Sequence, residues 1–152
     1  MSTSTIIKYV RSCAVPFLSA LVLTCLSAAP ATASDYQELG AIGKWKLTAA
    51  LDGADITSLD EHEARQLLGR VFTISKDHVR FGKRDCGAPE LTAKLVEPSH
   101  YLRQEAHASA ELLKLPNPVT VVELGCTIAF IKNPHTIVLL WKGWFFDAKR
   151  VR

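Results

Sequence analysis

The chain has 152 residues, a formal net charge of +3 at pH 7 and 48% hydrophobic residues. This near-neutral balance gives no general reason to expect attraction to nucleic acid or to a membrane surface. The length is that of one domain, and we find no internal repeat and no low-complexity tract.

Residues 1–33 have the pattern of a signal peptide. Lys8 and Arg11 precede an uncharged apolar run of roughly a dozen residues, and small residues follow up to Ala33. The run is shorter than the ~20 residues that cross a hydrocarbon core, and Pro16 interrupts it. We therefore expect cleavage after Ala33 rather than a membrane anchor.

Export has one alternative outcome, which is lipidation at Cys25. The preceding Val22-Leu23-Thr24 lacks the small residue that usually stands before a lipidated cysteine, so a free soluble product is expected. Removing the two leader cations takes the formal charge from +3 to about +1. Residues 34–152 are then a single globular domain, periplasmic or secreted, that no longer contacts the membrane.

Cys86 and Cys126 are the cysteines of this predicted domain. In an oxidising compartment two cysteines most simply form a disulfide, and closing a loop of about 40 residues stabilises by roughly 4 kcal/mol. No histidine lies within a few residues of either cysteine, so we expect no zinc site. No other metal and no cofactor is predicted.

The domain begins with an alternating strand over 43–49, followed by a turn at Asp52-Gly53. Ser58 and Glu61 have the spacing of a capping box, which predicts a helix over 59–68. Gly69 stands where a left-handed residue usually ends a helix.

A hairpin is predicted next, with strands at 70–75 and 78–81. If Lys76-Asp77 is its loop, Ile74 faces Val79 and Phe72 faces Phe81, so that both apolar pairs share one face. Residues 82–89 are expected to form a loop that carries Cys86, and 90–97 an edge strand.

The second half of the sequence, from Pro98 onward, predicts a helical stretch and then four strands. Pro98 opens the stretch as one helix or two short ones, with Leu102, Ala106, Ser109 and Leu113 on one face, and the prolines of 115–118 end it. Strands follow over 119–126, 128–131, 136–142 and 144–150, and the apolar run 137–146 indicates a central buried pair. The predicted fold class is α+β, a mostly antiparallel curled sheet or small barrel with one or two short helices.

Motifs for catalysis are mostly missing. His62 is followed four residues later by Gln66, where a zinc-protease helix needs a second histidine, and His100 and His107 are too far apart on a helix to share one ion. Paired carboxylates are available among the acids of one loop and helix start, but solubility and capping explain the same residues: Asp52, Asp55, Asp60, Glu61 and Glu63. We do not expect an enzyme, and a hydrolase is the third hypothesis.

Basic residues gather around the second hairpin and the loop after it: Lys76, Arg80, Lys83 and Arg84. A loop pinned by Cys86 and rich in positive charge is suited to entering an acidic cleft of a partner protein. The alternative is a solvated face that keeps the protein soluble.

Aromatic residues near the C-terminus allow another interpretation. Trp141 and Trp144, with Trp45 from the first strand, would form the walls of a cavity for a small apolar ligand. Core packing explains the same aromatics.

The sequence also resembles known groups of proteins. Gly43-x-Trp45 with the late Arg150 resembles lipocalin-like barrels, which implies that a first-strand tryptophan packs under a basic residue from the last strand. More widely, the chain is similar to small secreted proteobacterial proteins of unassigned activity through four short stretches: Leu67-Leu68-Gly69-Arg70, Cys86-x-x-Pro89, Leu115-Pro116 and Gly143-x-Phe145-Phe146. In size and in its stapled small barrel it also resembles the periplasmic inhibitors of lysozyme.

Two functional hypotheses lead from these observations. In the first, the protein is exported to the envelope and binds another macromolecule there, as an inhibitor or immunity factor against a wall-degrading enzyme. In the second, it is a lipocalin-like carrier of a small apolar ligand.

Overall fold

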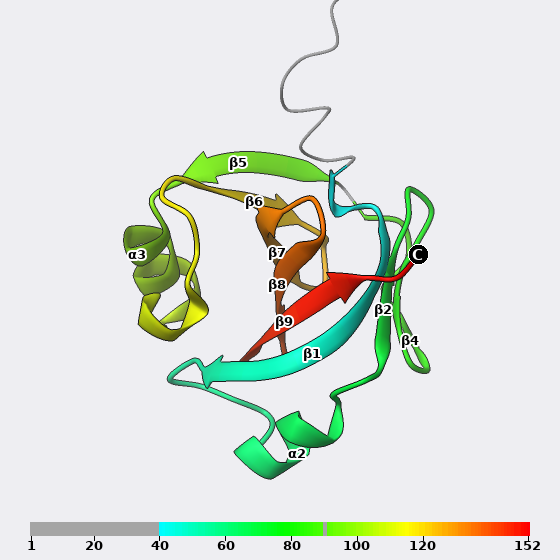
Figure 1. Ribbon diagram of the computed structural model, residues 1–152, viewed down its shortest axis with the longest axis horizontal. Coiled ribbons are helices and arrows are strands. Elements are labelled where there is room, and N and C mark those ends of the chain that lie inside the picture. Colours follow the sequence, from blue (N-terminus) through cyan, green and yellow to red (C-terminus); the bar gives the residue numbers. More distant parts are fainter. Residues whose placement is uncertain (1–39, 90) are drawn as a thin grey trace, which may run out of the picture. The chain divides into compact units, whose positions relative to one another are not determined.

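The structure is a computed structural model that describes residues 40–89 and 91–152. The predicted signal peptide, with Cys25, lies outside these residues. Within them, nine strands form one antiparallel sheet in the order β4-β3-β2-β1-β9-β8-β7-β6-β5, which curls into a half-barrel (Figure 1). The predicted fold class, a mostly antiparallel curled sheet with short helices, is confirmed.

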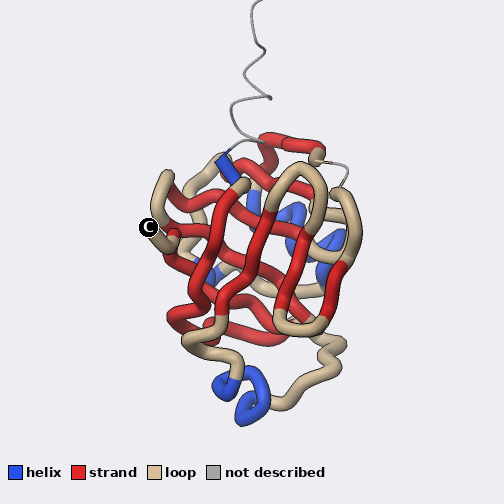
Figure 2. The backbone as a smooth tube through the Cα atoms, turned by 90° about the vertical axis from the view of Figure 1, so that its right-hand side faces the viewer, coloured by secondary structure: helices blue, strands red, loops and turns tan. Residues whose placement is uncertain are grey.

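Neighbouring strands are mostly consecutive in the chain, and the exception is β1, which pairs with both β2 and β9. Figure 2 shows the strands of the sheet side by side, with the short helix α2 beyond one end of the half-barrel. The strands are β1 (Gly43–Gly53), β2 (Val71–Ile74), β3 (Val79–Phe81), β4 (Arg84–Asp85), β5 (Thr92–Val96), β6 (Val119–Glu123), β7 (Ile128–Asn133), β8 (Thr136–Trp141) and β9 (Trp144–Arg150). The helices are α2 (Glu61–Gln66), α3 (Pro98–Tyr101), the π-helical η1 (Leu102–Ala106) and the 3-10 turn η2 (Glu111–Leu113).

Two apolar clusters lie on the two faces of the sheet. The inner cluster fills the half-barrel with fully buried side chains that include Trp45, Phe72 and Phe146. The outer cluster packs Leu102 and Leu113 of the helical segment against the other face of β6 to β9. Strands β8 and β9 are buried on both faces, which explains why the run 137–146 is almost continuously apolar and confirms the predicted central pair.

The first hairpin has the predicted register. Phe72 lies opposite Phe81 and Ile74 opposite Val79, and the Ser75 N–H donates to the His78 carbonyl to close the turn (2.9 Å). The segment predicted as a plain loop over 82–89 contains one further short strand, β4, paired with β3. A two-residue strand carries too little apolar alternation to be seen in the sequence.

Helix α2 begins two residues later than predicted. Its capping box is formed by Asp60 and Glu63 rather than by Ser58 and Glu61, because the Ser58 N–H is already used by the Lys142 carbonyl. Gly69 has the expected left-handed conformation, with φ of 83°. Ala64 is fully buried in the inner cluster, so α2 covers one end of the half-barrel.

The helical segment after Pro98 is one helix of nine residues followed by a separate 3-10 turn. Glu97 caps its start by accepting the backbone N–H of Ser99 and of His100, which lowers the pKa of this carboxyl below its ordinary value. His107, with φ of 47°, ends the helix. No helix within residues 40–89 and 91–152 has both the length and the apolarity needed to cross a bilayer.

The predicted disulfide between Cys86 and Cys126 is present, with Cα atoms 5.9 Å apart. Cys86 directly follows β4, at one edge of the sheet, whereas Cys126 lies between β6 and β7, near the other edge. Backbone pairing does not join these two regions, and the disulfide therefore ties the two sides of the curled sheet together.

Arg150 holds the N-terminal end of β1, opposite the end at Gly53. Its guanidinium lies 4.2 Å over the Trp45 ring and donates to the carbonyls of Gly40 (2.7 Å), Ile42 (2.7 Å) and Pro134 (3.0 Å). This contact between a first-strand tryptophan and a basic residue of the last strand is the one that the lipocalin-like resemblance implied.

Candidate functional site

A pocket of about 270 Å³ opens at the end of the half-barrel that α2 covers. The hairpin of β3 and β4, the turn between β8 and β9 and the segment around α2 meet there. Half of its lining residues are apolar and half are cationic: Leu59, Leu67, Phe81 and Trp141, with Arg70, Lys83, Arg84 and Lys142. We call these eight residues the basic pocket.

The apolar part of the basic pocket rests on a cluster of three aromatic rings. Phe72 stacks on Phe81 with 5.2 Å between ring centroids, and Trp141 meets both rings edge-on at 5.5 and 5.2 Å. Phe81 and Trp141 are buried. Since these rings come from β2, β3 and β8, the floor of the pocket is part of the core and is rigid.

Two arginines lie over this floor. The Arg84 guanidinium is 5.9 Å from the centroid of Trp141, and that of Arg70 is 5.2 Å from the centroid of Phe81. Strand register explains how Arg84 reaches this position: it lies opposite Phe81, so both side chains are on the inner face. Both arginines are thereby oriented by cation–π contacts.

The cations of the basic pocket have no acidic partner in the described part of the chain. The four ion pairs found there use other residues: Glu61 with Arg65, Asp85 with Arg80, Glu123 with Lys94, and Asp147 with Lys132. Among residues 40–89 and 91–152, no carboxylate lines the pocket. Four positive charges therefore converge at one site of a domain whose total charge is close to zero.

Lys142 reaches the pocket from the turn between β8 and β9. Lys142 and Gly143 have φ of 53° and 83°, and the loop that leads to α2 packs on them. The Ser58 N–H donates to the Lys142 carbonyl (3.0 Å), and the Ala54 N–H to the Gly143 carbonyl (2.8 Å). The Trp144 indole N–H also donates to the Leu59 carbonyl (2.8 Å), which fixes this wall.

Replacing Gly143 by alanine is expected to destabilise the domain by about 2–5 kcal/mol. A Cβ there would lie 2.6 Å from the Ile56 carbonyl oxygen and 2.7 Å from the Thr57 Cα, and the left-handed backbone adds its own cost. Urea unfolding of the two proteins measures the difference. Gly87→Ala, also at positive φ but with open space around its Cβ, is the matched control and should cost only about 1–2 kcal/mol.

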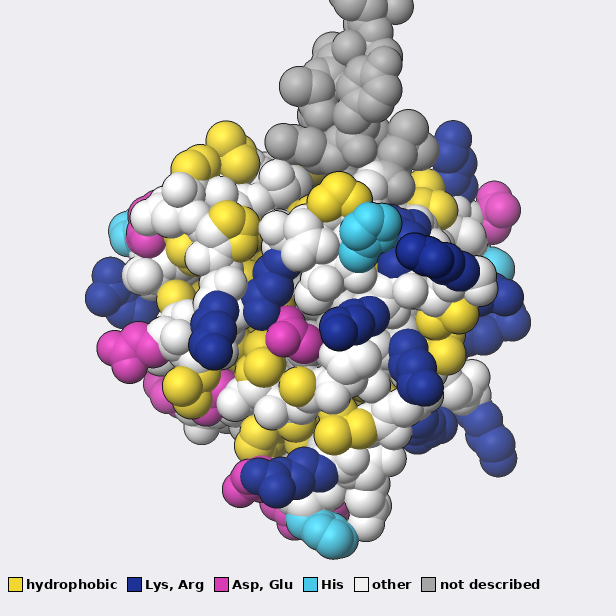
Figure 3. Space-filling model, in the orientation of Figure 1, with side chains coloured by type: hydrophobic (Ala, Val, Ile, Leu, Met, Phe, Trp, Pro, Cys, Tyr) yellow, Lys and Arg dark blue, Asp and Glu magenta, His cyan; other side chains and the backbone are white. Residues whose placement is uncertain are grey.

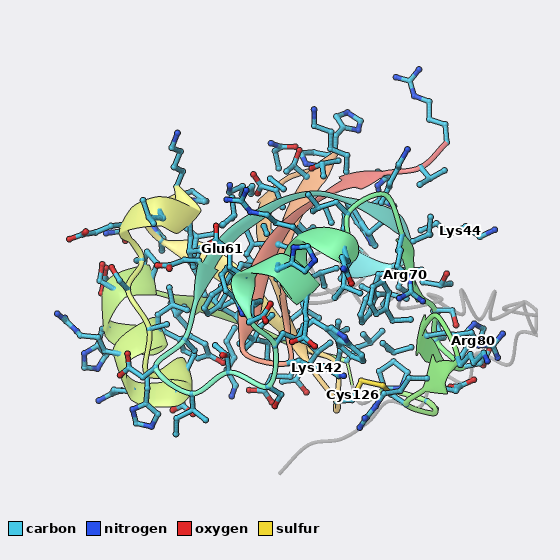
Figure 4. The ribbon with its side chains drawn as sticks, turned by 90° about the horizontal axis from the view of Figure 1, so that it is seen from below. Lys44, Glu61, Arg70, Arg80, Cys126 and Lys142 are labelled. Carbon is cyan, nitrogen blue, oxygen red and sulfur yellow. A yellow bond between two sulfur atoms is a disulfide. The ribbon has the colours of Figure 1, made fainter. Side chains whose placement is uncertain are left out.

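The four predicted partner-binding residues do not lie together. Lys83 and Arg84 line the basic pocket, whereas Lys76 lies in the turn at the other end of the hairpin. Arg80 faces outward and pairs with Asp85 (2.8 Å), so that its guanidinium, with the Gly87 N–H, lowers the pKa of that carboxyl below its ordinary value. Figure 4 looks at the α2 end and labels Arg70 and Lys142 of the basic pocket, with Arg80 at the outer edge.

Sequence reasoning missed Arg70 and Lys142. Arg70 directly precedes β2, so that continuing the hairpin register places it opposite Lys83, whereas Lys142 is distant in the chain and joins them only because the turn between β8 and β9 lies at the same pocket. The available signal for Lys142 was its position between Trp141 and Trp144 in a turn, where a lysine replaces the usual asparagine. Figure 3 shows Lys and Arg side chains gathered mainly over the half of the molecule that contains β2 to β4.

The three tryptophans of the carrier hypothesis do not surround one cavity. Trp45 is buried beneath Arg150 and donates to the Ala41 carbonyl (2.7 Å). Trp144 pairs with Gly53, at the other end of β1. Trp141 belongs to the basic pocket.

The acids considered for hydrolysis serve other purposes. Asp60 and Glu63 form the capping box, Glu61 pairs with Arg65, and Asp52 accepts the Gly53 N–H (2.9 Å). Asp55 lines a separate pocket of about 470 Å³ beside η1. No cluster of three or more histidine, cysteine or acidic side chains suited to a metal ion occurs in residues 40–89 and 91–152.

Comparisons with known protein families, curated proteins and solved structures find no match to this chain. The resemblances drawn from short motifs therefore remain hypotheses, and the function is argued from the site itself.

Proposed function

We propose that this protein is exported to the cell envelope and binds another macromolecule there through the basic pocket, without catalysis. Inhibition of, or immunity against, a wall-degrading enzyme is the specific form of this proposal. The observation that carries it is the convergence of Arg70, Lys83, Arg84 and Lys142 on an aromatic floor, with no carboxylate among the lining residues.

Electrostatics supports this assignment. Four like charges at one site repel one another, and all four side chains are exposed to solvent. An anionic partner group relieves this repulsion, so complementary charge steers encounter and favours the complex. Arginine and tryptophan are also the residues that most often dominate the binding energy of protein interfaces.

Packing favours this hypothesis over the lipocalin-like carrier. A carrier needs a ligand cavity inside its barrel. Here the interior is occupied by side chains that are fully buried against one another, among them Trp45, Phe72 and Phe146.

Export is supported by the disulfide. Cys86 and Cys126 are bonded, and such a bond persists in oxidising compartments and is rare in the cytosol. In the envelope it would also hold the hairpin that carries Lys83 and Arg84 in place, which lowers the entropic cost of binding.

The charge-reversed double variant Lys83→Glu with Arg84→Glu tests this function. We expect immobilised wild-type domain to retain a defined partner from envelope extract, and the variant to bind that partner about thirtyfold or more weakly, since disrupting a close charge pair costs 2 kcal/mol or more. Lys44→Glu with Lys76→Glu is the matched control, because it changes the net charge equally outside the pocket.

Equal retention of the partner by the wild-type domain and the pocket variant would remove the basic pocket as the binding site. Equal loss in both double variants would mean that the total charge, and not this site, governs the interaction.

A further inference from the structure

Lys142 has a backbone conformation that a lysine rarely adopts. It and Gly143 are the two central residues of the turn that joins Trp141 to Trp144, and positive φ at both positions is the signature of a type I′ turn. Asn-Gly is the preferred sequence in such turns, since asparagine tolerates this region better than other residues with a Cβ. A lysine here lowers the stability of the turn.

The strained residue is also held firmly in place. Its carbonyl accepts the Ser58 N–H, and the neighbouring Gly143 carbonyl accepts the Ala54 N–H. The backbone of Lys142 is thus fixed by the loop that leads to α2, and its side chain lines the basic pocket. Lys114 has a similar backbone conformation, with φ of 50°, but does not line this pocket, so that Lys142 is the strained lysine placed at the site.

We infer that Lys142 is an anion-binding residue of the basic pocket, and that it binds the carboxylate of an acidic side chain of a partner protein, next to an apolar residue of that partner. This inference rests on the function proposed above and adds the chemistry of the group that the pocket receives.

The dimensions and lining of the pocket favour an amino-acid side chain. Its volume of about 270 Å³ is below the roughly 300–1,000 Å³ of pockets that enclose small-molecule ligands. Four apolar residues accompany the four cations, which suits a carboxylate attached to an apolar neighbour better than a fully hydrated phosphate.

Two exposed apolar residues lie close in the chain to groups that form or support the pocket. Ile56, with 81% of its surface exposed, belongs to the loop whose backbone packs on Gly143, and Leu68, 37% exposed, directly follows the lining residue Leu67. Exposed apolar residues near a cationic site are typical of a protein-binding surface and are not needed to hold a free anion.

The test uses NMR of the indole N–H groups, which report on the site residue by residue. The indole of Trp45 donates to a backbone carbonyl far from the pocket and serves as the internal reference, while Trp141 lies in the pocket and Trp144 donates to the lining residue Leu59. The probe is the peptide acetyl-Leu-Glu-Leu-amide, added up to about 10 mM to detect millimolar dissociation constants. Its glutamine analogue, inorganic pyrophosphate and phosphatidylglycerol vesicles are the comparison probes.

We expect the glutamate peptide to shift the Trp141 signal and not the Trp45 signal, and the glutamine peptide to bind about tenfold or more weakly. Lys142→Asn should raise the midpoint of thermal unfolding by about 2–5 °C, because it relieves the strained turn, and weaken the glutamate peptide about fivefold or more. Lys44→Asn, outside the pocket, should leave the affinity unchanged.

Equal binding of the two peptides, tighter binding of pyrophosphate or vesicles, no shift of Trp141, or full affinity in Lys142→Asn each overturn the inference. Failure of this inference can be distinguished from failure of the proposed function. If the charge reversal at Lys83 and Arg84 abolishes capture of the partner while Lys142→Asn does not, the pocket is the binding site and only the role of Lys142 is wrong.

Discussion

Replacing Cys86 and Cys126 by alanine is expected to lower the free energy of unfolding by about 4 kcal/mol. The bond closes a loop with a sequence separation of 40 residues. Since small domains are stable by only about 5–15 kcal/mol, this loss is a large fraction of the total.

The second reason for a large effect is topological. The disulfide joins the end of β4 to the turn between β6 and β7, on opposite sides of the curled sheet. Strand β4 has two residues, and within the described residues this side is otherwise held to β3 by backbone hydrogen bonds and the ion pair of Arg80 with Asp85. Without the bond we expect Lys83 and Arg84 to lose their fixed position over the Trp141 ring.

Urea unfolding of the wild-type domain, the double-alanine variant and the reduced wild-type domain measures this effect. The last two should agree, which separates loss of the cross-link from loss of the cysteine side chains. A difference below about 1 kcal/mol between oxidised and reduced protein would contradict the prediction.

Arg150→Met is expected to cost about 3–5 kcal/mol. The guanidinium donates to three backbone carbonyls, those of Gly40, Ile42 and Pro134, and covers the Trp45 ring. Hydrogen bonds from a charged donor contribute about 1.5–3 kcal/mol each, and a cation–π contact about 0.5–2 kcal/mol, with incomplete additivity. Methionine keeps much of the apolar volume but donates nothing.

Two further variants test whether the loss of stability comes from the hydrogen bonds of the Arg150 guanidinium. Arg150→Lys keeps the charge but cannot span three carbonyls with one ammonium group, so it should recover less than half of the loss. Lys149→Met removes an exposed neighbouring cation on the same strand and should change stability by less than about 0.5 kcal/mol. A loss below about 1 kcal/mol in Arg150→Met would show that the cluster of hydrogen bonds does not hold the end of β1.

Local patterns determined much of this fold. The pairing of Phe72 with Phe81 and of Ile74 with Val79 follows from alternation around a short loop, because one face of the hairpin must be buried. The disulfide followed from a count of two cysteines, and the buried pair of strands followed from the apolar run 137–146. These features depend on residues that are close in the chain or on composition.

Other features depended on competition between distant groups. The capping box moved from Ser58 to Asp60 because the Ser58 N–H is taken by the Lys142 carbonyl, which lies far along the chain. The four predicted basic residues were separated because alternation places Arg80 and Arg84 on opposite faces of the sheet. Their distribution between the faces was visible only once the register of β4 was known.

The candidate site itself is a product of tertiary structure. The sequence alone predicted a small antiparallel domain with one disulfide and a region rich in positive charge. The hairpin register places Arg70 beside Lys83, but only the curl of the sheet brought Lys142 to them, over a floor of rings from three strands. The physical reason is that strand pairing and closure join residues about 60 positions apart, and such distances leave no periodic signal in a linear sequence.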